Sequence, residues 1–185
     1  MSIDFDRDEG IPLIHKMVLL FILDQMDFPI TDDSILNITS ESNAWIPWME
    51  CKEAIAKLVE INMVSQVIHE SKIYYTLTAD GRLCLSNFYN TIPASEREEI
   101  AGYIAENRMK YKRRQEYFRT YTKNSDGTYT VKLKIVNPGQ TLVDLTLNVS
   151  SRQIARNLHE TWDKKAGNIY RLLQEHLIDE WTEGS

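Results

Sequence analysis

The sequence has few of the residues on which catalytic and metal sites depend. It contains two cysteines, four histidines and seven glycines among 185 residues. Cys51 and Cys84 each lie within a helical pattern, and nothing in their spacing indicates a disulfide framework. The few cysteines and histidines offer few ligands for a metal ion. With so few glycines, a glycine-rich phosphate loop is hard to place. We therefore expect no metal and no cofactor.

Long hydrophobic runs are absent as well. The longest, residues 17–23, has seven residues, whereas a membrane-spanning helix needs about 18. The first ten residues are acidic, where a signal peptide would be basic. Hydrophobic residues make up 43% and charged residues 26% of the chain, which suits a packed core. We expect a soluble, cytoplasmic protein that does not associate with membranes.

Negative charge is concentrated in the N-terminal half. Residues 1–91 carry 14 acidic and 6 basic side chains, whereas residues 92–124 carry 5 acidic and 8 basic ones, in a chain of net charge −6. The one dense basic run contains Lys110, Lys112, Arg113 and Arg114. An acidic half repels phosphate at long range, so its charge opposes nucleic-acid binding.

The N-terminal half predicts three helices followed by a β-hairpin. Apolar periodicity predicts helices over 13–26 and 48–61, with a short helix capped by Thr31 between them and a loop over 39–47. In the third helix we expect Val59 and three other apolar residues to face inward and Ala54 to face elsewhere. Asn62 follows at a position that favours a left-handed residue. Two alternating segments, 64–70 and 73–78, predict the hairpin.

Two further helices are expected between residues 78 and 116. Thr78 is placed to cap the first, and Gly81 in its first turn indicates close packing or a tight turn. Ser95 and Glu98 have capping-box spacing at the start of the second, which we expect to reach about residue 114. The apolar side of the first is predicted to consist of Leu83, Leu85, Phe88 and Tyr89.

The C-terminal part predicts a three-stranded antiparallel meander covered by a helix. Strands are expected over 117–123, 128–136 and 141–149, joined by turns at 124–127 and 137–139. A capping box at Ser150 then starts a long amphipathic helix, or two helices that meet near Gly167. The fold class is α+β, with predicted domains 1–91, a connecting helix 92–116, and a small α+β domain 117–185 for dimerisation or sensing.

The order of three helices and a hairpin resembles the winged helix-turn-helix superfamily. Two segments carry this resemblance, residues 55–64 (IAKLVEINMV) and residues 75–81 (YTLTADG). The whole chain resembles a bacterial family of uncharacterised proteins through residues 23–29, 75–81, 92–100 and 142–147 (LDQMDFP, YTLTADG, IPASEREEI and LVDLTL). The resemblance implies an N-terminal winged helix and a transcriptional regulator, and it brings no established activity.

A winged helix predicts which residues meet DNA. Its third helix enters the major groove, and its wing touches phosphate or the minor groove. The candidate DNA-binding residues are Trp48, Glu50, Lys52, Glu53, Lys57 and Lys72, of which Lys52 and Lys72 would contact phosphate. The basic run Lys110, Lys112, Arg113 and Arg114 forms a secondary basic patch that is also explained as a solvated helix end.

Three functional hypotheses follow. The first is a homodimeric regulator that binds duplex DNA weakly and in a salt-sensitive way. The second is a winged helix that binds an unidentified protein instead, because the third helix has no arginine and Trp48 is typical of interfaces. The third is a small-molecule sensor or enzyme in the C-terminal part. We expect no enzyme activity, because the sequence has no glycine-rich phosphate loop, nucleophile elbow or metal-protease motif. The His159–Asp163 and His176–Glu180 pairs could each hold a metal ion only with a third ligand, and none is indicated.

Overall fold

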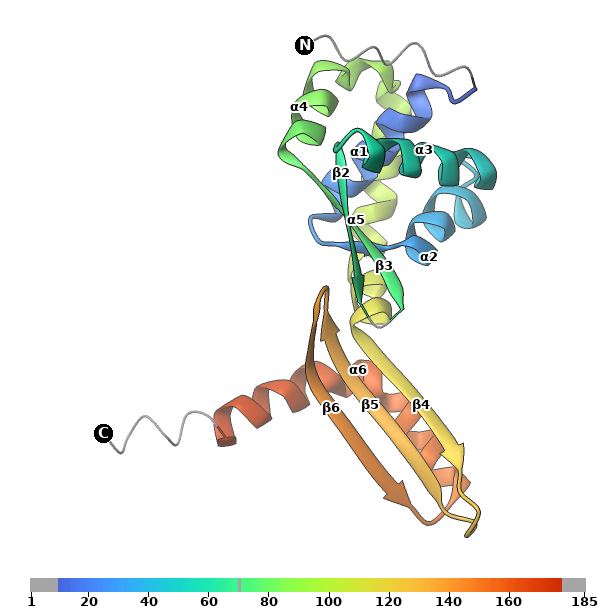
Figure 1. Ribbon diagram of the computed structural model, residues 1–185, viewed down its shortest axis with the longest axis vertical. Coiled ribbons are helices and arrows are strands. Elements are labelled where there is room, and N and C mark those ends of the chain that lie inside the picture. The colour runs from blue at the N-terminus through green and yellow to red at the C-terminus, as the bar shows by residue number, and fades with distance from the viewer. Residues whose placement is uncertain (1–9, 70, 178–185) are drawn as a thin grey trace, which may run out of the picture. The chain divides into compact units, whose positions relative to one another are not determined.

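A computed structural model describes residues 10–69 and 71–177 of the chain (Figure 1). The contacts divide the chain into two compact units, residues 1–112 and residues 113–185. The three-part division into 1–91, 92–116 and 117–185 stays a prediction. None of the helices in the described ranges is long and apolar enough to cross a membrane.

Unit 1 is built around a buried central helix, α1 (Leu13–Met26). Its residues 17–23 are each at most 4% exposed, so the helix buries all its faces and not one stripe. The other elements are β1 (Ile30–Thr31), α2 (Asp32–Leu36), η2 (Asn37–Ser42), α3 (Trp48–Glu60), β2 (Val64–His69), β3 (Lys72–Leu77), α4 (Ala79–Asn87), η3 (Tyr89–Thr91) and α5 (Ala94–Glu116), whose last turn reaches into unit 2.

The sheet of unit 1 has the strand order β1-β3-β2. Strands β2 and β3 form the predicted hairpin, in which Val64 pairs with Leu77. Strand β1 was not predicted, because two residues cannot display an alternating pattern. It is defined by its partner instead, since Ile30 pairs with Tyr75 far along the chain.

Several local signals in unit 1 are confirmed. The hydroxyl of Thr31 accepts from the backbone N–H of Ser34, at 3.4 Å, and caps α2. Thr78 caps α4 in the same way through Gly81 N–H, at 3.0 Å. Asn62 is left-handed, with φ of 59°. A Cβ added to Gly81 would lie 2.1 Å from a backbone carbonyl oxygen, so close packing explains this glycine.

Other expectations for unit 1 were wrong. Residues 39–42 of the expected loop over 39–47 belong to the π-helix η2. Ala54 is buried, because it lies three residues after Cys51 and four before Leu58 on the inward face. Leu83 is 62% exposed, whereas Leu85 is buried, since residues two apart on a helix cannot share a face.

Neither predicted capping box begins its helix at the expected residue. Helix α5 begins at Ala94, so Ser95 already lies inside it. Helix α6 (Arg152–Leu177) begins two residues after Ser150, and the hydroxyl of Ser151 accepts from the N–H of Ile154 at 3.3 Å. The type of signal was correct at α6, but it acts one residue later than predicted.

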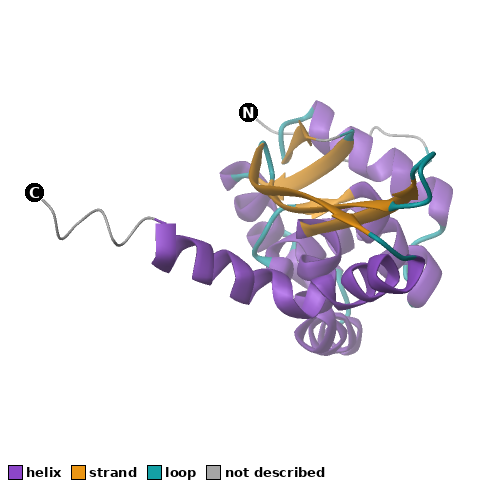
Figure 2. Ribbon diagram, turned by 90° about the horizontal axis from the view of Figure 1, so that it is seen from below, coloured by secondary structure: helices purple, strands orange, loops and turns teal. Residues whose placement is uncertain are grey.

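Unit 2 is a two-layer structure. Strands β4 (Tyr117–Lys123), β5 (Tyr129–Asn137) and β6 (Gln140–Val149) form an antiparallel sheet in the order β4-β5-β6, which confirms the meander. Helix α6 is one continuous helix through Gly167 and lies against one face of this sheet (Figure 2). The core between the layers consists of Val131, Leu133, Ile135, Ala155, Trp162 and Ala166.

Candidate nucleic-acid interface

Helix α3 presents one face to the core of unit 1 and the other to solvent. Cys51, Ala54, Ile55 and Leu58 form the buried face. The exposed side chains are Trp48, Met49, Glu53, Ala56 and Glu60. The spacing of small and apolar residues on the inner face fixes the rotation of the helix, and this rotation leaves its outer face uncovered.

Some of the residues that were predicted to read bases are exposed to solvent, and one forms a contact within unit 1. Trp48 is 48% exposed, and the Lys52 ammonium lies 5.7 Å from its ring centroid. Glu53 is exposed. Glu50 turns toward α1, where its Oε2 lies 2.7 Å from Nδ1 of His15. The structure therefore leaves Trp48 and Glu53 accessible and engages Glu50 within unit 1.

The three lysines among the candidate DNA-binding residues lie close to acids. Lys52 Nζ is 2.7 Å from Asp32 Oδ2. Lys57 Nζ is 3.0 Å from Glu60 Oε2, one helical turn later. Lys72 lines a hollow that also includes Asp32 and Asp33. The positive charges on this side of unit 1 are therefore partly neutralised by carboxylates.

Asp32 is a residue whose role the sequence did not reveal. Its two carboxylate oxygens bind two different residues. Oδ2 receives Lys52, and Oδ1 accepts a hydrogen bond from the hydroxyl of Tyr75 at 3.3 Å. Burial, and then the charge of Asp32, raise the pKa of Tyr75 to about 12. This group joins α2, α3 and β3 beneath the candidate interface.

The cysteines show no sign of catalytic use. Both are buried and free. Burial raises the pKa of the Cys51 thiol, whose sulfur also accepts from the hydroxyl of Thr39 at 3.2 Å. Burial likewise raises the pKa of Cys84. A raised pKa disfavours the thiolate that nucleophilic chemistry requires.

The secondary basic patch is largely exposed. Lys110 and Lys112 belong to unit 1, whereas Arg113 and Arg114 belong to unit 2. Lys110, Arg113 and Arg114 are exposed, and the Lys112 ammonium lies 5.9 Å from the centroid of the Phe28 ring. Lys112 is thus held against its own unit, while the other three side chains reach solvent.

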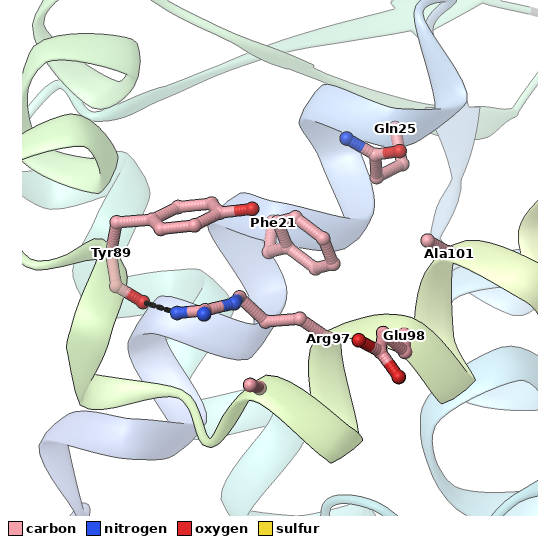
Figure 3. A pocket seen from close by; sticks show the side chains of 7 residues that line it. Phe21, Gln25, Tyr89, Arg97, Glu98 and Ala101 are labelled. Carbon is pink, nitrogen blue, oxygen red and sulfur yellow. Dashed lines mark hydrogen bonds between the residues drawn. The ribbon is translucent and has the colours of Figure 1, made fainter.

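A hollow between α1, η3 and α5 was not predicted from the sequence (Figure 3). Arg97 stands at its side, with its guanidinium carbon 4.2 Å from the centroid of the Tyr89 ring. One guanidinium nitrogen, Nη1, donates to the carbonyl oxygens of Tyr89 and Ile92 at 2.8 and 3.0 Å. The lining residues are Phe21, Gln25, Tyr89, Ala94, Arg97, Glu98 and Ala101.

Among the residues that the structure describes, no three His, Cys, Asp or Glu side chains gather into a metal site. Asp163, four residues after His159, forms an ion pair with Arg119. The ring of His159 packs edge-on against Tyr121, and burial, then the charge of Arg119, lower its pKa. Glu180 lies outside the described residues.

One comparison with known proteins identifies a family. A family model described as a domain of unknown function (DUF4364) matches residues 15–177, which include parts of both units. No curated protein and no solved structure matches the chain. The description of the family names no activity, so function has to be argued from the side chains. The chain belongs to the DUF4364 family of domains of unknown function.

Proposed function

We propose that residues 11–91 form a winged helix that binds duplex DNA and that the protein is a transcriptional regulator. The observation that carries this proposal is the uncovered outer face of α3, followed directly by the β2–β3 hairpin. The strand order β1-β3-β2 and the short helix α2 before α3 support it. Such an arrangement suits a helix that enters the major groove beside a wing.

In this proposal the exposed side chains of α3 face the base edges. Glu53 is exposed and can accept a hydrogen bond from a cytosine amino group. Lys57 lies one turn further along the same helix. Lys52 and Lys72 contact phosphates on either side of the groove, and the exposed Lys110 of α5 gives additional attraction.

The ion pairs of the lysines do not prevent phosphate binding. In the Lys57–Glu60 pair the two side chains are 42% and 67% exposed. Pairs with this exposure contribute about 0–1 kcal/mol, so exchanging Glu60 for phosphate costs little. Lys52 is held more firmly, because its partner Asp32 is 21% exposed and also binds Tyr75. We therefore expect Lys57 to contribute more than Lys52.

The number of lysines sets the salt dependence. When the charge of Lys57 is counted together with the phosphate contacts of Lys52 and Lys72, three neutralised phosphate charges per protomer give a slope of about −2.7 for log affinity against log salt. A rise from about 50 to about 200 mM salt should then weaken binding by one protomer about 40-fold. Binding to generic duplex is thus expected to be weak and strongly salt-sensitive.

The test is a fluorescence anisotropy titration of a labelled duplex of about 25 base pairs at several salt concentrations. Lys57→Glu should weaken binding and reduce the salt slope by about one. Lys132→Glu makes the same charge change at an exposed position of the unit 2 sheet, and it should have a smaller effect. Equal effects of the two variants, or no binding at about 50 mM salt, would refute the proposal.

A second candidate is favoured by the apolar side chains at the start of α3. Trp48 is 48% exposed and Met49 is 60% exposed, and both residue types are enriched at protein interfaces. In this alternative the winged helix binds a protein partner without DNA. Trp48→Ala should then reduce partner binding more than Lys57→Glu does.

We also propose that the protein is a homodimer. The support lies at the end of α6, where Leu172 is 38% and Leu177 is 64% exposed. Large exposed apolar patches mark association surfaces, and we propose that a second copy of the chain covers these two leucines. Light scattering at tens of micromolar protein should give twice the 21.6 kDa mass of the chain, whereas a monomer mass would contradict the proposal.

A further inference from the structure

The hollow beside Arg97 combines an apolar floor with two opposite charges (Figure 3). Phe21 is 3% exposed and forms part of the floor, and Ala94 and Ala101 leave space above it. Arg97 and Glu98 contribute the charges, and Gln25 contributes an amide. The volume is about 280 Å³, near the lower end of the roughly 300–1,000 Å³ typical of small-molecule sites.

The guanidinium group of Arg97 is held in place by its contacts, but some of its hydrogen-bond donors have no partner among the residues that the structure describes. Its Nη1 donates to backbone carbonyl oxygens on η3 and before α5, and its plane lies over the Tyr89 ring. Its Nε and Nη2 have no hydrogen-bond partner among the residues that the structure describes. A guanidinium fixed in this way presents its remaining donors at little entropic cost, and paired donors suit a carboxylate.

Glu98 offers the complementary charge. It is the next residue on α5 and lines the same hollow. It is exposed, and it has no ion pair with Arg97 or with any other residue in ranges 10–69 and 71–177. A cation and an anion thus line one small hollow without neutralising each other.

We propose that this hollow binds a small zwitterion, namely a free α-amino acid with an apolar side chain. The ligand carboxylate binds Nε and Nη2 of Arg97, and its ammonium group binds the Glu98 carboxylate. Its side chain packs on Phe21 and Tyr89, in the space that Ala94 and Ala101 leave open. This site lies in unit 1, not in the C-terminal part where sensing was expected, and it does not depend on DNA binding.

The single-charge alternatives fit less well. A ligand with a carboxylate but no ammonium group would leave Glu98 without an opposite charge. A ligand with an ammonium group but no carboxylate would leave Arg97 without one. Each would place a like charge in the same hollow, which opposes binding. Only a ligand with both charges satisfies both side chains.

The test is an NMR titration of the full-length ¹⁵N-labelled protein with L-leucine and L-phenylalanine. Two matched analogues of leucine, 3-methylbutylamine and 4-methylpentanoate, carry the ammonium or the carboxylate alone. We expect saturable shifts around the hollow with at least one amino acid, and binding at least about tenfold weaker for the analogues of leucine than for leucine itself.

Variants locate the binding. Glu98→Gln keeps the shape and removes the charge, so it should weaken amino-acid binding by about tenfold. Glu106→Gln is the matched control, because Glu106 is exposed on α5 but does not line the hollow. Absence of saturable binding up to about 10 mM of either amino acid would overturn the proposal. Equal affinity of an analogue and leucine, or an unchanged affinity in Glu98→Gln, would overturn it too.

Discussion

The two units bury their helices in different ways. In unit 1, helix α1 is surrounded, and eight consecutive residues in it, 16–23, are at most 4% exposed. In unit 2, helix α6 covers one face of a thin sheet, and its contacts with the sheet core end at Tyr170. Unit 1 can therefore present α3 on a rigid support, whereas unit 2 depends on a few side chains between two layers.

The largest expected effect comes from the core of unit 2. Trp162 is 2% exposed, and its Nε1 donates to the carbonyl oxygen of Lys134 at 3.2 Å. Trp162→Ala should cost about 3–5 kcal/mol of stability, because a large cavity opens between helix and sheet. Hydrogen exchange read by mass spectrometry should show lost protection in β4–β6 and retained protection in α1. An equal loss of protection in β4–β6 and in α1 would mean that unit 1 does not keep its packing independently of the unit 2 core.

A smaller effect tests how tightly unit 1 is packed. A Cβ at Gly81 would lie 2.1 Å from the carbonyl oxygen of Met63 and 2.6 Å from Leu77 Cδ1. Gly81→Ala should therefore cost about 3 kcal/mol in urea unfolding, since backbone must move.

Two other helical glycines serve as controls. Nothing lies within 4 Å of a Cβ at Gly102. Gly102→Ala should therefore raise the free energy of unfolding by about 0.5–1 kcal/mol, because alanine has the higher helix propensity. At Gly167 in α6 the Tyr117 hydroxyl lies at 3.2 Å, and this flexible group can move, so Gly167→Ala should be nearly neutral. A destabilising Gly167→Ala as large as Gly81→Ala would remove the contrast between the units.

These glycines also show what the sequence can predict. Thr78 caps α4 through the N–H of Gly81, three residues along the chain, and this local signal was correct. Gly81 itself indicated close packing or a tight turn, without naming the distant Met63 against which it packs. Strand β4 was predicted with its observed bounds, Tyr117–Lys123. Local patterns carry such features, since they depend on short-range geometry alone.

Features that depend on distant partners were missed. Strand β1 exists because residues 30–31 pair with residues 74–75. The pairing of Lys52 with Asp32 joins residues 20 apart, so the sequence indicated the charges without their contact. The hollow at Arg97 brings α1 and α5 together, and no pattern within one segment indicates such a meeting. The sequence thus indicated which residues to consider for the candidate site, but not the contacts that these residues make.

The smallest effect concerns pH. The pKa of Tyr75 is raised to about 12 by burial and by Asp32, whereas an unfolded tyrosine titrates near 10. The unfolded state loses its proton first, so this contribution to stability is complete below pH 10 and is lost between about pH 10 and about pH 12. Urea unfolding at about pH 9 and pH 11 should show a smaller decline for Tyr75→Phe than for the unchanged protein. An identical decline in stability for the two proteins would mean that folding does not raise the pKa of Tyr75.

The most direct measurement of the central claim is a selection of randomised duplex DNA by the purified full-length protein at about 50 and about 200 mM salt. The uncovered face of α3 and the proposed dimer predict enrichment of a near-palindromic motif at the lower salt and weaker recovery at the higher. No enrichment at either concentration would contradict the DNA-binding proposal, and the exposed Trp48 and Met49 would then mark a protein-binding surface.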